Sequence, residues 1–183
     1  MYKRQEIKSG DLIIIESTSP VGTTNKVAEI IFERTGLDSK DIHIAYCPER
    51  VIPGNILYEL VENDRVIGGY TSEASQKAKT FYSTFCNGKL NVTDTKVAEL
   101  VKLSENTYRD INIAFANELS MICENLNINT LEVIKYSNQH PRVNILNPGC
   151  GVGGHCIAVD PWFIASQYPN DTNLIQALSL IHI

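Results

Sequence analysis

The sequence lacks the features that mark several large classes of protein. None of its five cysteines forms a Cys-x-x-Cys pair, so a disulfide framework is a poor interpretation and a reducing cytoplasm is favoured. No apolar run approaches the ~20 residues of a membrane helix, and no apolar segment follows the charged N-terminal residues as it would in a signal peptide. No basic stripe accompanies the net charge of −5. We therefore expect a globular cytoplasmic chain that binds neither nucleic acid nor membrane.

Glycine and proline are also absent from about Asp94 to Asn127. Apolar residues recur there at helical spacing, which predicts one helix of roughly 33 residues, about 50 Å long. A helix of that length bridges domains or packs against a partner chain. We therefore expect a homodimer formed through this helix. A shorter helix is predicted over residues 130–138.

The first half of the chain alternates between apolar runs and helical patterns. Strands are predicted over residues 11–16, 42–47, 65–69 and 89–93, helices over 23–35 and 72–85, and a long loop from residue 48. Thr23 and Thr24 are suited to cap the first of these helices. The alternation is typical of an α/β fold whose parallel sheet is doubly wound and Rossmann-like, and in such sheets ligands bind beyond the carboxyl ends of the strands.

These patterns predict three segments. Residues 1–93 form the tail of the Rossmann-like domain, and residues 94–177 form an all-helical central domain for dimerisation and substrate binding. Residues 178–183, LSLIHI, break the preceding helical pattern and resemble the translation of a sequencing-library adapter. We expect those six residues to be non-native and the chain to be a fragment. The Gly-x-Gly-x-x-Gly loop expected in the first βα turn of such a sheet is missing.

A glycine-rich stretch precedes one cysteine near the end of the chain. Four glycines lie just ahead of Cys156, and Asp160-Pro161 then opens a predicted helix. Glycines let the backbone approach a bound group closely, and the positive end of a helix dipole favours a thiolate. The stretch indicates a nucleophilic thiol beside an anion-binding loop; the alternative is an inert buried thiol. The inert interpretation is preferred for the other cysteines, which are Cys47, Cys86, Cys123 and Cys150.

Three separate motifs of the sequence resemble those of one enzyme family. Gly-x-Gly-Val-Gly-Gly-His-Cys-Ile-Ala-Val-Asp-Pro-Trp-Phe, over residues 149–163, resembles the active-site cysteine loop of the nucleotide-sugar 6-dehydrogenases, the UDP-glucose/GDP-mannose dehydrogenase family. Ser-Thr-Ser-Pro-Val-Gly-Thr-Thr and Cys-Pro-Glu-Arg-Val-Ile-Pro-Gly resemble the family's loops beside the nicotinamide and the sugar. The similarity runs from about Asp11 to Gln176.

The resemblance implies roles for individual residues. The implied catalytic residues are Cys156, Lys102, Asn106, Asp160 and Glu49. The implied substrate-binding residues are Arg50, Val51, Arg109, His140, Arg142 and Gly153. Thr18 takes the place of a threonine near the nicotinamide of NAD. Pro53 stands where the UDP-glucose enzymes carry a second glutamate, which argues against glucose as the sugar.

The implied reaction is a four-electron, NAD-dependent oxidation of UDP-N-acetyl-D-mannosamine at C6, within surface-polysaccharide synthesis. Cys156 would carry the sugar as a thiohemiacetal and then as a thioester that water hydrolyses to the uronate. UDP-N-acetylglucosamine and UDP-glucose are alternative substrates. A further alternative is an inactive dimerisation module, and we expect these 183 residues alone to bind NAD weakly or not at all. A zinc enzyme using His155 and Cys156 is disfavoured because structural zinc ligands come as paired knuckles, so no metal is expected.

Several of these residues have simpler interpretations. Lys102, Asn106 and Arg109 share one helix face and would, without the resemblance, be a solvated polar stripe. In that case Glu105 would pair with Arg109 at the surface. A surface salt bridge between Glu49 and Arg50, a loop or capping role for Thr18, and a plain loop histidine at His140 also remain open.

Overall fold

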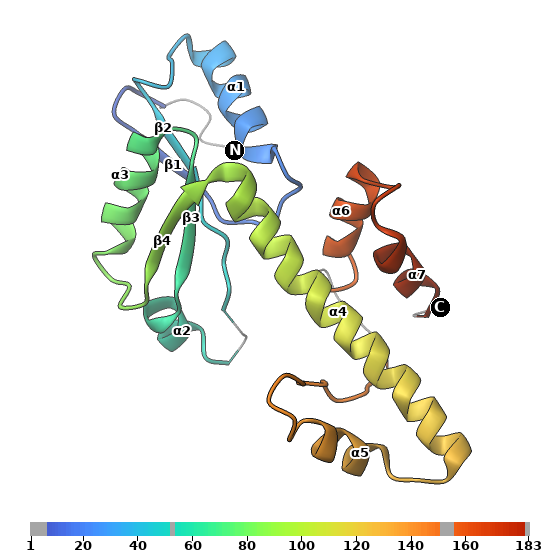
Figure 1. Cartoon of the computed structure of the whole chain (residues 1–183). Helices are drawn as coiled ribbons and strands as arrows, with labels where there is room; N and C mark the ends of the chain where they lie inside the picture. The colour runs from blue at the N-terminus through green and yellow to red at the C-terminus, as the bar shows by residue number, and fades with distance from the viewer. Residues whose placement is uncertain (1–6, 52–53, 151–155, 182–183) are drawn as a thin grey trace. The chain divides into compact units, whose positions relative to one another are not determined.

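The computed structural model describes residues 7–51, 54–150 and 156–181 (Figure 1). The chain divides into two compact units, residues 1–102 and 103–183, and the division falls inside the long helix. Our boundary at residues 93/94, drawn at the start of that helix, stays a prediction.

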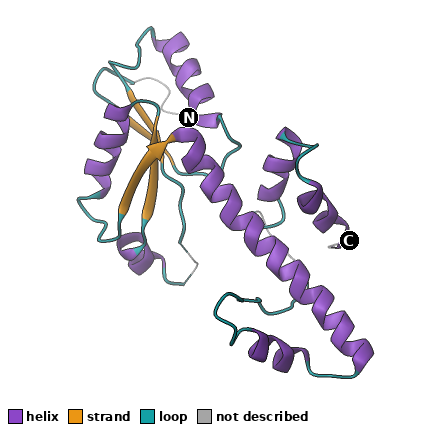
Figure 2. Ribbon diagram, viewed as in Figure 1, coloured by secondary structure: helices purple, strands orange, loops and turns teal. Residues whose placement is uncertain are grey.

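The first unit is built on a four-stranded sheet, drawn in orange in Figure 2. The strands are β1 (Leu12–Ile15), β2 (His43–Tyr46), β3 (Arg65–Gly69) and β4 (Leu90–Asp94), and they lie in that order. β1 pairs parallel with β2, and β3 pairs parallel with β4, each across a helical connection. This confirms the expected α/β fold class. β2 and β3 pair antiparallel over two residues, because β3 starts at the end of the sheet where β2 finishes.

Three helices accompany this sheet, α1 (Thr23–Thr35), α2 (Ile56–Glu62) and α3 (Ser72–Tyr82). α2 shows that the long loop expected from residue 48 is wrong, because a two-turn helix forms directly after the turn at Gly54. α3 begins where the side chain of Thr71 accepts a hydrogen bond from the backbone N–H of Ala74, and it ends three residues before the predicted boundary.

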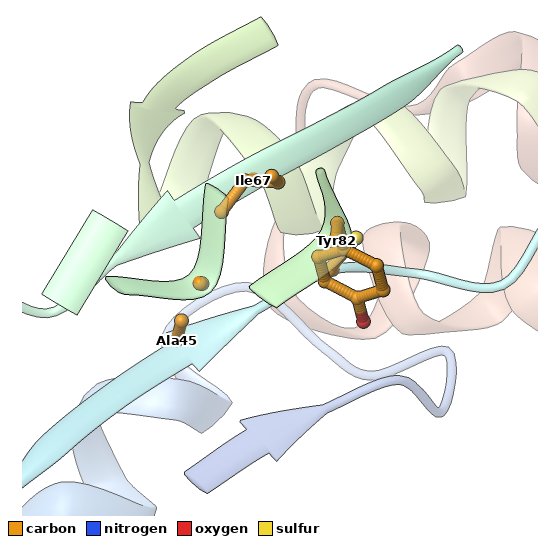
Figure 3. Packing of buried hydrophobic residues seen from close by; sticks show 5 residues of the cluster. Ala45, Ile67 and Tyr82 are labelled. Atoms are coloured by element: carbon orange, nitrogen blue, oxygen red, sulfur yellow. The ribbon is translucent and has the colours of Figure 1, made fainter. Parts of the chain in front are cut away.

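Side chains alternate between the two faces of β2 and are buried on both. Ala45 and Cys47 pack with Ile67 of β3 and with Ala78 and Tyr82 of α3. Figure 3 labels Ala45, Ile67 and Tyr82 of this cluster. On the opposite face, Ile42 and Ile44 pack with Ala28 of α1. Burial on both faces explains why this segment is apolar at most of its positions, with His43 as a buried polar exception. It also fixes the carboxyl end of β2, from which the loop carrying Glu49 departs.

The long helix α4 (Thr95–Leu126) has 32 residues and confirms the predicted element. It ends at Asn127, whose φ of 58° lies in the left-handed region that asparagine tolerates. Three shorter helices follow, α5 (Thr130–Ser137), α6 (Asp160–Gln167) and α7 (Asn173–Ile181). α7 keeps the backbone of residues 178–181 helical, while the non-native origin of the tail stays a prediction. Within the described part of the chain, no helix is both long enough and apolar enough to span a membrane.

Candidate active site

Thr18 lies half-buried in the loop that joins β1 to α1. The expected capping of α1 by Thr23 and Thr24 is wrong. The helix has Gly22 at its N-cap and no capping hydrogen bond from a side chain at that position. The hydroxyl of Thr23 instead donates to the carbonyl of Pro20, at 2.6 Å. The free N–H groups at this helix end are satisfied by a residue far along the chain, Glu99.

Glu49 lies half-buried beyond the end of β2 and is held by its own loop. Its Oε1 accepts hydrogen bonds from the backbone N–H groups of Arg50, at 2.6 Å, and of Val51, at 3.1 Å. Its Oε2 lies 3.9 Å from a guanidinium nitrogen of Arg65, whose side chain is 4% exposed. Arg50 donates to the carbonyl of Asp64, at 3.0 Å. The loop therefore presents Glu49 with one oxygen fixed by backbone and the other beside a buried cation.

Arg65 is a buried cation that the sequence analysis did not single out. It donates to the carbonyl of Leu60, at 2.9 Å, and its guanidinium lies 4.6 Å from the centre of the Tyr82 ring. Burial of Arg65 lowers its pKa, but the neighbouring Cys47 and Glu49 outweigh this and leave the pKa raised. Delocalised charge and a planar head make arginine the cation best suited to such a site.

Cys47 and Tyr82 complete this buried group. Burial raises the pKa of the Cys47 thiol and of the Tyr82 phenol, and the phenol also donates to a carboxylate oxygen of Glu16, at 2.6 Å. A raised pKa keeps the Cys47 thiol protonated, which suits the inert interpretation. Cys123 is likewise buried, Cys86 is half-buried, and Cys150 is exposed.

Lys102, Asn106 and Arg109 all lie on α4, with Lys102 half-buried and Arg109 exposed. Asn106 is 5% exposed, and its amide donates to Oδ2 of Asp160, at 2.5 Å. Asp160 is 3% exposed and is the first residue of α6. A buried carboxylate with an amide donor is far more stable than one without a partner. This contact fixes the start of α6 against the middle of α4.

Cys156 is exposed and lies in the turn that leads into α6. Its carbonyl accepts hydrogen bonds from the backbone N–H groups of Val159, at 3.1 Å, and Asp160, at 2.8 Å. The predicted position just ahead of a helix is therefore confirmed. Since Asp160 is held by Asn106, the same contact anchors the turn that carries the thiol.

The segment from the end of α5 to Gly149 is held by two asparagine side chains. Asn138 donates to the carbonyl of Ile145, at 2.9 Å, and accepts from its N–H, at 2.7 Å. Asn117 of α4 accepts from the N–H of Gly149, at 2.8 Å. These bonds fix both ends of the segment that precedes the cysteine loop.

His140 and Arg142 lie between these anchors, and both are exposed. Nδ1 of His140 accepts from the backbone N–H of Arg142, at 3.3 Å, so the imidazole has a local structural partner and still presents its other nitrogen to solvent. Gly153, with the rest of residues 151–155, lies outside the described residues.

The side chains that anchor these segments were missed by sequence reasoning. Glu99, Asn117 and Asn138 are single polar residues within a helix or at its end, and one such residue has no periodicity to distinguish an anchor from a solvated side chain. Glu99 carried the only available signal, since it lies among the apolar residues 97–101 of a helix.

Two family descriptions match this chain. The UDP-glucose/GDP-mannose dehydrogenase family's NAD binding domain matches residues 4–86, and its central domain matches residues 96–181. The chain belongs to the UDP-glucose/GDP-mannose dehydrogenase family. This membership confirms the resemblance carried by the motifs.

Individual members of the family are closely similar to the chain. It is 53% identical to the UDP-N-acetyl-D-mannosamine dehydrogenase of Yersinia pestis, over 96% of this chain and 44% of that relative. It is 54% identical to the NDP-N-acetyl-D-galactosaminuronic acid dehydrogenase of Ralstonia solanacearum, over 93% of this chain and 42% of that relative.

A solved structure, the UDP-D-ManNAc dehydrogenase of Pyrococcus horikoshii, superposes with a TM-score of 0.93 at 45% identity, covering 96% of this chain and 42% of that one. The chain therefore spans less than half the length of each of these three relatives.

Proposed function

We propose that the protein carrying this chain oxidises a UDP-N-acetylhexosamine at C6 to the uronate, with NAD as hydride acceptor and N-acetyl-D-mannosamine as the sugar. The observation that supports this most is the arrangement of Cys156. Cys156 is exposed, yet its turn is tied to α4 through the buried contact between Asn106 and Asp160. A reactive side chain that is accessible and held by a rigid support is what nucleophilic catalysis requires.

The chemistry assigns a task to each group. Oxidation of the C6 alcohol to an aldehyde releases a hydride and a proton. The Cys156 thiolate adds to the aldehyde carbon and forms a C–S bond, and loss of a second hydride from C6 leaves a thioester. Water then breaks the C–S bond and gives the carboxylate and the free thiol. Lys102 and Asn106 stabilise the oxygen that becomes negative.

Glu49 is proposed to take the proton of the attacking water. Its two oxygens face different groups, a pair of backbone N–H donors and the Arg65 cation. Asp160 is proposed to orient Asn106 rather than to move protons, because its carboxylate is buried against that amide. Arg50, Val51, Arg109, His140, Arg142 and Gly153 are proposed to bind the nucleotide sugar.

The described residues are better suited to hold the nicotinamide end of NAD than its diphosphate. When bound, NAD supplies the acceptor for hydride, and the polar loop with Thr18 at the carboxyl end of β1 is suited to hold its nicotinamide end. The N-terminus of α1, a position that often binds phosphate, is filled by the Glu99 carboxylate. The diphosphate of NAD is therefore assigned to residues other than this helix end.

Two N-acetylhexosamines are the candidate sugars. The relatives named for N-acetylmannosamine and for N-acetylgalactosaminuronic acid are 53% and 54% identical to this chain, so identity does not separate them. Both are N-acetylhexosamine enzymes by name, which agrees with Pro53 standing at the position that is glutamate in the glucose enzymes. A UDP-N-acetylgalactosamine substrate is therefore the second candidate.

Turnover of matched sugars tests the proposal. The full-length protein should release about two NADH per UDP-N-acetylmannosamine, as the four-electron chemistry requires, and should favour it over the N-acetylgalactosamine, N-acetylglucosamine and glucose analogues by about tenfold or more in kcat/KM. The measurement is NADH absorbance against uronate formed. A higher kcat/KM for UDP-N-acetylgalactosamine would identify that compound as the substrate in place of UDP-N-acetylmannosamine. Failure to form NADH from any of the four sugars would contradict the proposed dehydrogenase activity.

We also propose that the protein is a homodimer through α4. Tyr108, Phe115 and Ile122 are spaced by seven residues, and Leu126 follows at the next turn. All four are exposed, by 49–63%, and at about 100° per residue they fall within one narrow stripe of the helix. An exposed apolar stripe at heptad spacing is the seam by which a helix packs on a second copy. Lys102, Asn106 and Arg109 lie on other sides of the helix.

Placing a charge in this stripe should weaken the dimer. We expect Phe115→Glu to raise the dimer dissociation constant by about a hundredfold or more, because two glutamates would be buried near the symmetry axis. Sedimentation velocity of the full-length protein over a dilution series measures this. Glu124→Lys, about half a turn round the same helix, is the matched control and should leave the dimer intact. Equal dissociation by both variants would contradict the assignment of the seam.

A further inference from the structure

The Glu99 side chain is fully buried although it ends in a carboxyl group. One carboxylate oxygen accepts from the N–H of Gly22, at 2.6 Å, and the other accepts from the N–H and the hydroxyl of Thr24, at 2.7 Å each. A carboxylate that loses its hydration needs this number of donors to remain stable. The donors are separated from Glu99 by 75 to 77 residues in sequence, so the contact is tertiary.

The contact depends on the backbone conformation at the start of α1. Gly22 has a φ of 94°, in the left-handed region where a side chain would be strained, and this conformation turns its N–H toward the carboxylate. The free N–H groups and the dipole at a helix N-terminus favour a negative charge. Glu99 therefore caps α1 from outside.

A second contact lies one turn earlier on α4. The hydroxyl of Thr95 donates to the side-chain oxygen of Asn25, at 2.9 Å. Both Thr95 and Asn25 belong to the first turns of their helices. Two bonds one turn apart fix the rotation of α4 about its axis as well as its distance from α1.

The contacts of Glu99 and Thr95 with the start of α1 form a junction between the two helices. Functional groups lie on either side of this junction. The loop with Thr18 enters α1 at Gly22, and Lys102 follows Glu99 by three residues on α4, so both are attached to the junction through short, regular backbone. We propose that Glu99 is a positioning residue that fixes Lys102 relative to the loop with Thr18. The inference rests on the proposed function, in which this loop holds the nicotinamide and Lys102 acts at the reacting oxygen.

The test is the full-length protein with Glu99→Gln, which keeps the size of the side chain but turns an NH2 group toward one set of donors. We expect kcat to fall about 10- to 100-fold while the KM for the UDP-sugar changes less than about threefold, because chemistry and not sugar binding loses its geometry. Glu118→Gln, an exposed glutamate on the same helix, is the matched control and should retain the wild-type kcat.

Thr24→Val provides a milder variant that removes one of the donors and keeps the shape. We expect a fall in kcat of about three- to tenfold, and a double variant less impaired than the product of the two single effects, since both act on one junction. Fully multiplicative effects, or a kcat for Glu99→Gln equal to that of the control, would overturn the positioning role alone. A wild-type protein that forms no NADH would instead overturn the proposed function.

Discussion

Replacement of Cys156 by serine in the full-length protein should lower kcat for uronate formation by about a thousandfold or more. A serine hydroxyl is almost fully protonated near neutral pH, so it adds to an aldehyde far less readily than a thiolate and gives an ester that is harder to hydrolyse. The turn around residue 156 is held by its backbone carbonyl, so the substitution should leave the fold unchanged. Uronate formed and NADH released are the quantities to measure, with a melting curve beside them.

Cys150→Ser is the matched control for this prediction. Cys150 is also exposed and lies only six residues earlier, so it shares the solvent access of Cys156 without the turn into α6. We expect it to keep the wild-type kcat. Comparable losses in the two variants would indicate that the cysteines act through the local fold, and full activity of Cys156→Ser would remove the covalent mechanism.

The fold was predictable where one physical signal ran over many residues. The absence of glycine and proline gave α4 nearly to the residue, and the mostly apolar composition of β2 reflects its burial between α1 and α3. α2 was missed because seven residues carry too little periodicity to stand out after Pro53-Gly54. The antiparallel pairing of β2 with β3 was missed, because the direction of a strand depends on the path that the segment connecting the two strands takes in space.

The motifs singled out Cys156 and Glu49 as candidate site residues, because loops with several special residues are distinctive in sequence, and their catalytic roles stay predictions. Cys156 lies in a turn supported by the contact between Asn106 and Asp160 in one unit, and Glu49 lies beside Arg65 in the other. Asn106 and Asp160 were candidates too, but the sequence did not indicate their contact with each other, and it did not distinguish Arg65. Each support depends on a partner that only the folded chain brings close, and its own residue type is common. Candidate reactive residues are therefore easier to recognise in the sequence than the contacts that hold them in place.

The buried pair of Asn106 and Asp160 carries the second large prediction. Asn106→Asp places two carboxylates in contact where an amide now donates to a carboxylate, with both side chains almost without solvent. We expect the free energy of unfolding to fall by about 2–4 kcal/mol, since a buried carboxylate loses this amide donor and gains a like charge. We expect kcat to fall by at least about a hundredfold, because the start of α6 and the turn with Cys156 depend on this contact.

The pH dependence of this variant separates repulsion from a simple lost bond. Protonation of one carboxyl relieves the repulsion, so the fall in melting temperature should be smaller at about pH 5 than at about pH 8. Asn112→Asp, where the amide donates only to the carbonyl of Tyr108 on the same helix, is the matched control and should change stability by less than about 1 kcal/mol. A variant with a pH-independent loss equal to that of the control would mean that Asp160 finds another donor, and α6 would then be anchored by something other than Asn106.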